Sequence, residues 1–77
     1  MNNTRRAQLR RAASMIETAQ YIIEEVKEQE QEAYDNLPEG LQESDRGRDI
    51  DENAYTLEMA LDEIETIVDS LYEVVER

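Results

Sequence analysis

The sequence contains no cysteine and no histidine. Their absence excludes disulfides, thiol nucleophiles, zinc sites built from sulfur or imidazole, and every mechanism that needs an imidazole base. Phenylalanine and tryptophan are also missing, so the four tyrosines are the only aromatic residues. No phosphate-binding loop and no nucleophile–base pair can be assembled from what remains. We therefore expect no catalytic residue, no metal site and no cofactor, and a protein that is not an enzyme.

Long apolar runs are missing as well. The longest is Tyr21-Ile22-Ile23, whereas a signal peptide needs about 7–15 apolar residues and a membrane-spanning helix about 20. Basic residues are few, because 8 Lys and Arg stand against 20 Asp and Glu and give a net charge of −12. Nucleic acid and anionic membrane surfaces repel such a chain. We expect a cytosolic protein that binds neither of them directly.

Glycine and proline, the strongest breakers of regular backbone, occur in one short segment only. The segment contains Pro38, Gly40 and Gly47, which are the only glycines and proline in the chain. Pro38 disfavours a helical conformation at the preceding Leu37, so a first helix should end near Asn36. The chain is therefore expected to turn once, near its middle.

Ser44 is a favourable N-cap for a second helix, although the glycine three residues later weakens the first turn of that helix. We therefore expect one domain over residues 1–77, with a helix at 4–36, a turn at 37–44 and a helix at 45–76. Where the second helix becomes regular near that glycine is left open by the sequence.

Apolar residues recur at steps of three and four along both helical ranges, which is the spacing of one helix face. In the first range they are Leu9, Ala12, Ile16, Ala19, Ile23, Val26, Ala33 and Leu37, with Glu30 in the single gap. In the second they are Ile50, Ala54, Leu57, Leu61, Ile64, Val68, Leu71 and Val75. When the chain folds back, small residues of one row meet large residues of the other, as close helix packing requires. The pattern predicts an all-α fold, a long antiparallel helical hairpin.

A second apolar row runs beside each of these faces. It consists of Met15 and Ile22 in the first helix and Ala60, Ile67 and Val74 in the second. The combined stripe is wider than a two-stranded seam needs and is typical of helices that face a bundle core. We therefore expect self-association, most simply a homodimer that forms a four-helix bundle, although a different protein could cover the same row.

Acidic side chains form a ridge along the second helix at steps of three and four. The ridge consists of Glu58, Asp62, Glu65, Asp69, Glu73 and Glu76. Carboxylates four residues apart lie about 6 Å apart along a helix, close to the spacing of phosphates along one nucleic-acid strand. The ridge could therefore occupy the basic groove of a nucleic-acid-binding protein, or it could simply keep the protein soluble.

The basic residues of the first helix are Arg5, Arg6, Arg10 and Arg11. Folding of the hairpin brings them level with Glu73 and Glu76, so we expect ion pairs there. Such pairs would offset unfavourable interactions of both groups with the helix dipoles.

Two further groups of residues deserve a functional interpretation. Apolar and aromatic residues around the turn could form a binding hot spot, although they could also cap or border the bundle: Tyr34, Leu37, Leu41 and Tyr55. Glu25 and Glu28 have the E-x-x-E form with which all-α nucleotide pyrophosphohydrolases hold Mg²⁺. The answering motif on a later helix is missing, because Leu61 follows Glu58 at the third position, so this enzyme class is a remote alternative.

The turn carries the string EAYDNLPEGLQESDRG, residues 32–47. With the basic start of the chain, this string resembles small acidic helical-hairpin proteins encoded in bacteriophage and prophage genomes. The resemblance implies a phage protein made in the bacterial cytoplasm, where many such proteins bind host or phage proteins. It assigns no functional residues.

The sequence as a whole favours a non-catalytic protein-binding module. We expect a phage-encoded acidic modulator or inhibitor of nucleic-acid-mimic type, whose partner is a host or phage protein with a basic surface. The alternative is a structural or assembly hairpin that oligomerises and has no charge-based target. The sequence does not identify the partner.

Overall fold

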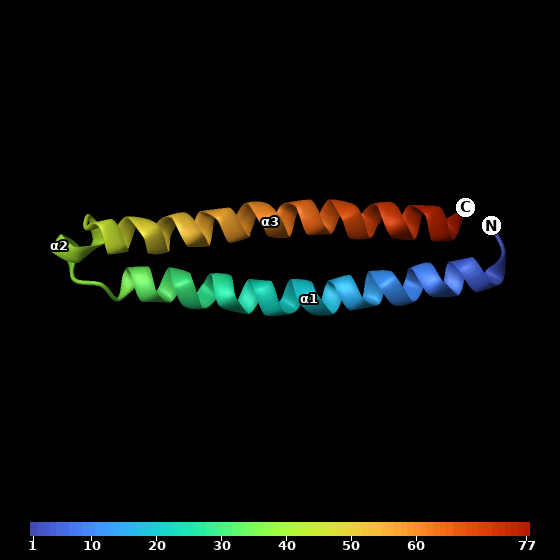
Figure 1. Ribbon diagram of the computed structural model, residues 1–77, viewed down its shortest axis with the longest axis horizontal. Helices are drawn as coiled ribbons and strands as arrows, with labels where there is room; N and C mark the ends of the chain where they lie inside the picture. Colours follow the sequence, from blue (N-terminus) through green and yellow to red (C-terminus); the bar gives the residue numbers. More distant parts are fainter.

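The computed structural model describes residues 1–77 and consists of helices joined by short connections (Figure 1). The helices are α1 (Asn3–Asp35), α2 (Glu39–Gln42) and α3 (Asp45–Glu76). The long helices α1 and α3 lie side by side and antiparallel, with both chain termini at one end and α2 at the other (Figure 1). The resulting rod measures 58 × 14 × 13 Å. The structure thus confirms the all-α hairpin, and none of its helices has the length and apolar character needed to cross a membrane.

The ends of α1 follow from local hydrogen bonding. At its start the side chain of Asn2 accepts a hydrogen bond from the backbone N–H of Arg5 at 2.8 Å, which satisfies one free donor of the first turn. At its end the backbone N–H of Leu37 donates to the carbonyl of Tyr34 at 3.1 Å. Pro38 then has an extended conformation, with φ −54° and ψ 145°, and the chain leaves the helix there. The helix lies one residue earlier at each end than the sequence predicts.

The turn is more ordered than the sequence suggests, because α2 lies within it. Backbone N–H groups of Leu41 and Gln42 donate to the carbonyl of Pro38 at 2.8 and 3.1 Å. The side chain of Gln42 donates to the carbonyl of Tyr34 at 3.1 Å and so fastens the turn to the end of α1. Ser44 caps α3 by accepting from the backbone N–H of Gly47 at 3.2 Å. These bonds connect the turn to both long helices.

Gly47 does not delay the start of α3, which is helical from Asp45. Gly47 is buried, and a Cβ atom built on it would lie 2.5 Å from the carbonyl oxygen of Leu41 and closer still to that of Gln42. Only a residue without a side chain allows α2 to pack this closely on the first turn of α3. Gly47 is therefore a packing requirement of the turn.

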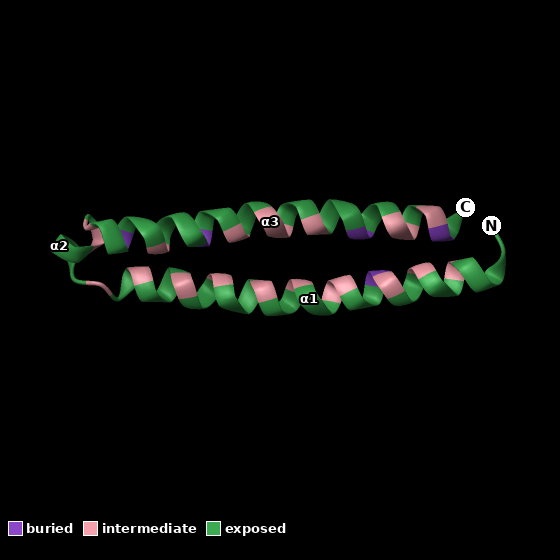
Figure 2. Ribbon diagram, viewed as in Figure 1, coloured by how far each residue is buried: buried purple, intermediate pink, exposed green.

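The seam of α3, meaning the row that faces α1, is the predicted one. Ala54, Val68 and Val75 are buried, and the other members of the row are partly buried: Ile50, Leu57, Leu61, Ile64 and Leu71. Figure 2 shows that the buried and partly buried residues of both long helices face each other, whereas the outer sides are exposed. The hairpin core is one stripe wide.

The predicted seam of α1 is wrong at every second position. Leu9, Ile16 and Ile23 face α3 as expected. Ala19 and Ala33 are exposed, Val26 is 43% exposed, and Ala12 is only partly buried beside the fully buried Ala13. At each of these positions the residue one later in the sequence faces α3. The seam of α1 therefore contains four side chains that were not predicted: Ala13, Gln20, Lys27 and Tyr34. The alternating steps of three and four residues are those of a left-handed antiparallel coiled coil.

Side-chain size and length explain this rotation of α1. Tyr34 brings far more apolar area to the seam than Ala33. The aliphatic stems of Gln20 and Lys27 can pack against α3 while their polar ends reach the edge of the seam. The side chain of Lys27 is indeed only 25% exposed and still reaches a carboxylate of α3. Polar residues in the seam therefore do not prevent packing.

The two glycines give a matched test of the turn. Replacing Gly47 by Ala should lower the free energy of unfolding by about 1–3 kcal/mol, because the new methyl group meets backbone oxygens that cannot move cheaply. Replacing Gly40 by Ala should change it by about 1 kcal/mol or less, since nothing lies within 4 Å of a Cβ there and its φ is not positive. Thermal or urea unfolding of both variants measures the difference. Equal stability of the two variants would contradict this description of the turn.

Candidate functional site

The edge of the seam beside Lys27 forms a continuous groove between α1 and α3. Towards the turn it is lined by residues of both helices: Lys27, Glu28, Gln31, Glu32, Asp35, Asp51, Ala54, Tyr55 and Glu58. Towards the termini it continues along Gln20, Glu24, Lys27, Glu58, Leu61, Asp62 and Glu65. Acidic side chains dominate both stretches, and Lys27 is the only basic residue in either.

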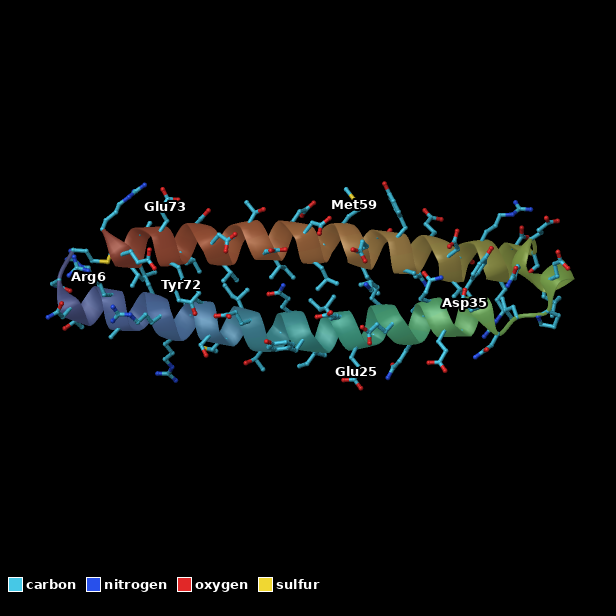
Figure 3. The ribbon with its side chains drawn as sticks, turned by 180° about the vertical axis from the view of Figure 1, so that it is seen from behind. Arg6, Glu25, Asp35, Met59, Tyr72 and Glu73 are labelled. Carbon is cyan, nitrogen blue, oxygen red and sulfur yellow. The ribbon has the colours of Figure 1, made fainter.

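We call this side of the hairpin the acidic face. Its acidic residues are Glu17, Glu24, Glu28, Glu32 and Asp35 of α1 and Asp51, Glu58, Asp62, Glu65 and Asp69 of α3. Four members of the predicted ridge, Glu58 to Asp69, belong to this face and are exposed. Glu73 lies off it, on the outer side of α3, and bonds to Arg77 at 2.9 Å (Figure 3). The structure thus adds acidic residues of α1 to the ridge, which the sequence had located on α3 alone.

Lys27 and Glu58 form the only ion pair between the two long helices. The Nζ atom of Lys27 lies 2.8 Å from Oε2 of Glu58. This hydrogen bond, more than the surrounding carboxylates, raises the pKa of Lys27 above 10.5. Both side chains are accessible to water, so the pair fixes the register of the helices more than it adds to stability.

Tyr72 and Glu17 make a second bridge on the same side. The hydroxyl of Tyr72 donates a hydrogen bond to Oε1 of Glu17 at 2.5 Å, and Figure 3 shows Tyr72 pointing from α3 toward α1. The bond stabilises the neutral phenol, and with partial burial it raises the pKa of Tyr72 above 10.0. The remaining tyrosines of this face, Tyr21 and Tyr55, are largely exposed.

The opposite edge of the seam carries an apolar row, which we call the apolar flank. A groove there is lined by Val26, Glu30, Glu52, Asn53, Thr56 and Leu57, and Glu30 accepts a hydrogen bond from Asn53 at 3.3 Å. Residues seven apart share one side of a coiled-coil helix. The residues at steps of seven from Val26 on α1 and from Asn53 on α3 therefore lie along this same edge. The apolar flank consists of Ala12, Met15, Ala19, Ile22 and Val26 of α1 and Ala60, Ile67 and Val74 of α3.

Much of the apolar flank is in contact with water. Met15 is 64% exposed, Ile22 60% and Ile67 51%, whereas Ala60 and Val74 are partly buried. The sequence identified these five residues as a second row but placed Ala12, Ala19 and Val26 in the seam. The rotation of α1 moves those three residues onto the flank. A signal for this was present, since a row through Ala13, Gln20 and Lys27 also keeps the coiled-coil spacing.

The residues suggested as a hot spot around the turn differ in burial and in the surface to which they belong. Tyr34 belongs to the seam, and Tyr55 lines the acidic groove. Leu37 is partly buried at the end of α1, while Leu41 of α2 is 51% exposed. A binding role for these four residues stays a prediction.

The expected ion pairs of the N-terminal arginines are not formed. Glu73 pairs with Arg77, the residue that caps the end of α3, and Arg6 donates a hydrogen bond to the side chain of Asn3 at 3.3 Å. Glu25 points away from α3 (Figure 3), whereas Glu28 lines the acidic groove. The two carboxylates of the E-x-x-E motif thus face different surroundings, and no group of three or more acidic residues is placed to hold a metal ion.

Comparison with known proteins gives no match among family models, curated proteins or solved structures.

The bridge between Tyr72 and Glu17 predicts an alkaline titration. The difference between the phenolate absorbance of the wild type and of the Tyr72→Phe variant reports Tyr72 alone, and its midpoint should lie above pH 10.0. Because the pKa is raised in the folded state, the bond contributes to stability below about pH 10 and is lost as the pH rises through the raised value. Replacing Glu17 by Ala should lower the midpoint. A midpoint at or below 10.0 in the wild type would contradict the hydrogen bond.

Proposed function

We propose that this chain is a non-catalytic protein-binding module whose acidic face binds a protein with a basic surface. The observation that carries the proposal is the composition of that face, on which ten carboxylates from two helices surround a single lysine. A surface of one sign that extends along a groove attracts a partner of the opposite sign and speeds association with it.

The chemistry of the face narrows the kind of partner. Carboxylates follow each other at helical steps along both edges of the groove, so the charge is linear, as it is along a nucleic-acid strand. Tyr21 and Tyr55 add exposed aromatic rings to the same side, and tyrosine is enriched among residues that dominate binding energy. We propose a nucleic-acid-binding protein as the partner, and a modulator or inhibitor that occupies its basic groove. A phage-encoded protein acting in the bacterial cytoplasm, as the turn string implies, fits this role.

We further propose that the hairpin works as a homodimer in which the apolar flank is covered by a second copy. The flank is continuous with the seam, and a four-helix bundle would bury both in one core. The acidic face lies at the opposite edge of the seam and stays accessible in such a dimer. The same apolar flank also favours the alternative function, an assembly hairpin that acts through oligomerisation alone.

Reversal of charge on the acidic face separates these two functions. We would replace Asp62, Glu65 and Asp69 by Lys and leave Glu58 unchanged, so that its ion pair with Lys27 is kept. The fold should survive, because all three side chains are exposed. Capture of a basic partner from bacterial lysate should weaken at least about tenfold, and duplex DNA should compete with the wild type for that partner.

The control is a variant with the same change in net charge, produced by three Glu→Lys substitutions outside the acidic face. Glu25, Glu39 and Glu43 are exposed and line neither groove of the acidic face, so their replacement by Lys should leave capture within about twofold of the wild type after screening at physiological salt. Equal capture by all three proteins, or capture that duplex DNA does not affect, would contradict the nucleic-acid-mimic function.

A further inference from the structure

We infer that the second copy docks on the apolar flank with its turn at the opposite end of the rod, so that the two hairpins lie head to tail. This inference rests on the homodimer proposed above and adds its geometry. It follows from the positions of the apolar and charged residues along the rod.

Two kinds of two-fold dimer can bring the apolar flanks of two hairpins together. In the first, both turns lie at the same end, and α1 packs against α3 of the second copy. In the second, the turns lie at opposite ends, and each long helix packs against its own counterpart. Neighbouring helices are antiparallel in both arrangements, as in most four-helix bundles.

The apolar residues fit both arrangements. With turns at opposite ends, Ala19 lies on the two-fold axis, Met15 meets the partner's Ile22, and Ala12 meets the partner's Val26. On α3, Ile67 then lies near the same axis. With turns at the same end, Ala19 of α1 would meet the partner's Ile67. With turns at the same end a small side chain meets a large one, whereas with turns at opposite ends Ala19 meets Ala19 and Ile67 lies near Ile67. Both arrangements cover the apolar row, so the burial of apolar area alone does not choose between them.

Charge does choose, because it is unevenly distributed along the rod. Lys27 lies level with Glu58, and Glu30 lies level with Asn53, so residues 21–63 form the half of the rod that contains the turn. This turn half holds fifteen acidic and three basic residues and thus carries the entire net charge of −12. The terminal half holds five acidic residues and five arginines and is neutral.

With turns at the same end, the two turn halves would lie side by side, about 10 Å apart. Each would face an equal negative charge within roughly one Debye length, which is about 8 Å at physiological ionic strength. With turns at opposite ends, the centres of the two turn halves are about 35 Å apart, at 1.5 Å per residue along the helices. Salt then screens most of their repulsion.

The head-to-tail arrangement also brings opposite charges together. Arg5 lies seven residues before Ala12 and so continues the row of the apolar flank toward the N-terminus. Because the two-fold axis passes through Ala19, Arg5 of one copy lies opposite Ala33 of the second copy. Glu30 and Glu52 line the flank near that Ala33. Arg5, which makes no ion pair with an acidic residue in the hairpin, would therefore face carboxylates of the second copy.

Disulfide formation tests the orientation, because the chain has no cysteine of its own. In the Ala19→Cys variant the two substituted positions adjoin each other only when the turns lie at opposite ends. Under mild oxidation this variant should form a disulfide-linked dimer at least about tenfold faster than Thr18→Cys. Thr18 is a matched control, since it is exposed and lies seven residues before Glu25, which points away from α3 in Figure 3.

The Ile67→Cys variant extends the test. In head-to-tail dimers, two copies of the Ile67→Cys variant form a disulfide with each other, and an equimolar mixture with the Ala19→Cys variant gives no mixed disulfide. In dimers with turns at the same end, only the mixed disulfide forms. Circular dichroism checks that each variant stays helical, and the mass of the reduced protein is measured in parallel. A two-chain mass with the mixed disulfide, or with no disulfide, overturns the orientation while leaving the homodimer intact. A one-chain mass overturns both.

Discussion

A hairpin of two helices can bury only one stripe of each helix, and this limit shapes the whole molecule. Each long helix has a single neighbour, so only the row that faces it leaves the water. The buried residues are accordingly few, namely Ala13, Gly47, Ala54, Val68 and Val75. The apolar surface of α1 is wider than one stripe, and its apolar side chains outside the seam form part of the exposed apolar flank. That surplus is the physical reason to expect a second copy.

The two edges of the seam differ in chemistry, and we propose a different role for each. One edge carries carboxylates from both helices, bridged by Lys27 and Tyr72. The other carries the apolar flank, where Met15, Ile22 and Ile67 are half exposed or more. Because the seam lies between them, self-association through one edge leaves the other accessible. A dimer of this kind would present two acidic faces on opposite sides of one bundle.

Much of the fold could be predicted from the sequence, because its strongest signals are local. Pro38 ends the first helix and Ser44 begins the second. The seam of α3 was predicted correctly because no adjacent row of that helix has an equally continuous apolar spacing. The seam of α1 was not, because Ala12 and Ala13 are both apolar and Tyr34 stands beside Ala33. Spacing alone cannot decide between adjacent rows; the area that Tyr34 buries and the reach of Lys27 to Glu58 depend on the position of α3.

The candidate site could be predicted only in part for the same reason. The ridge on α3 follows from spacing along one helix, but its continuation onto α1 depends on the rotation of α1 in the hairpin. The packing role of Gly47 was hidden because it arises from α2, a helix too short to be read from the sequence. The pairing of Glu73 with Arg77 shows that a neighbour close in sequence can be preferred to one across the seam.

Small-angle X-ray scattering at micromolar concentration tests the central claim most directly, because it yields mass and length from the same sample. If two hairpins pack side by side through their apolar flanks, the mass is twice the 9.0 kDa of one chain. The longest dimension then stays close to the 58 Å of a single hairpin, apart from a small stagger at the ends. A mass of one chain, or a two-chain mass with a length near twice that of the hairpin, would contradict the account.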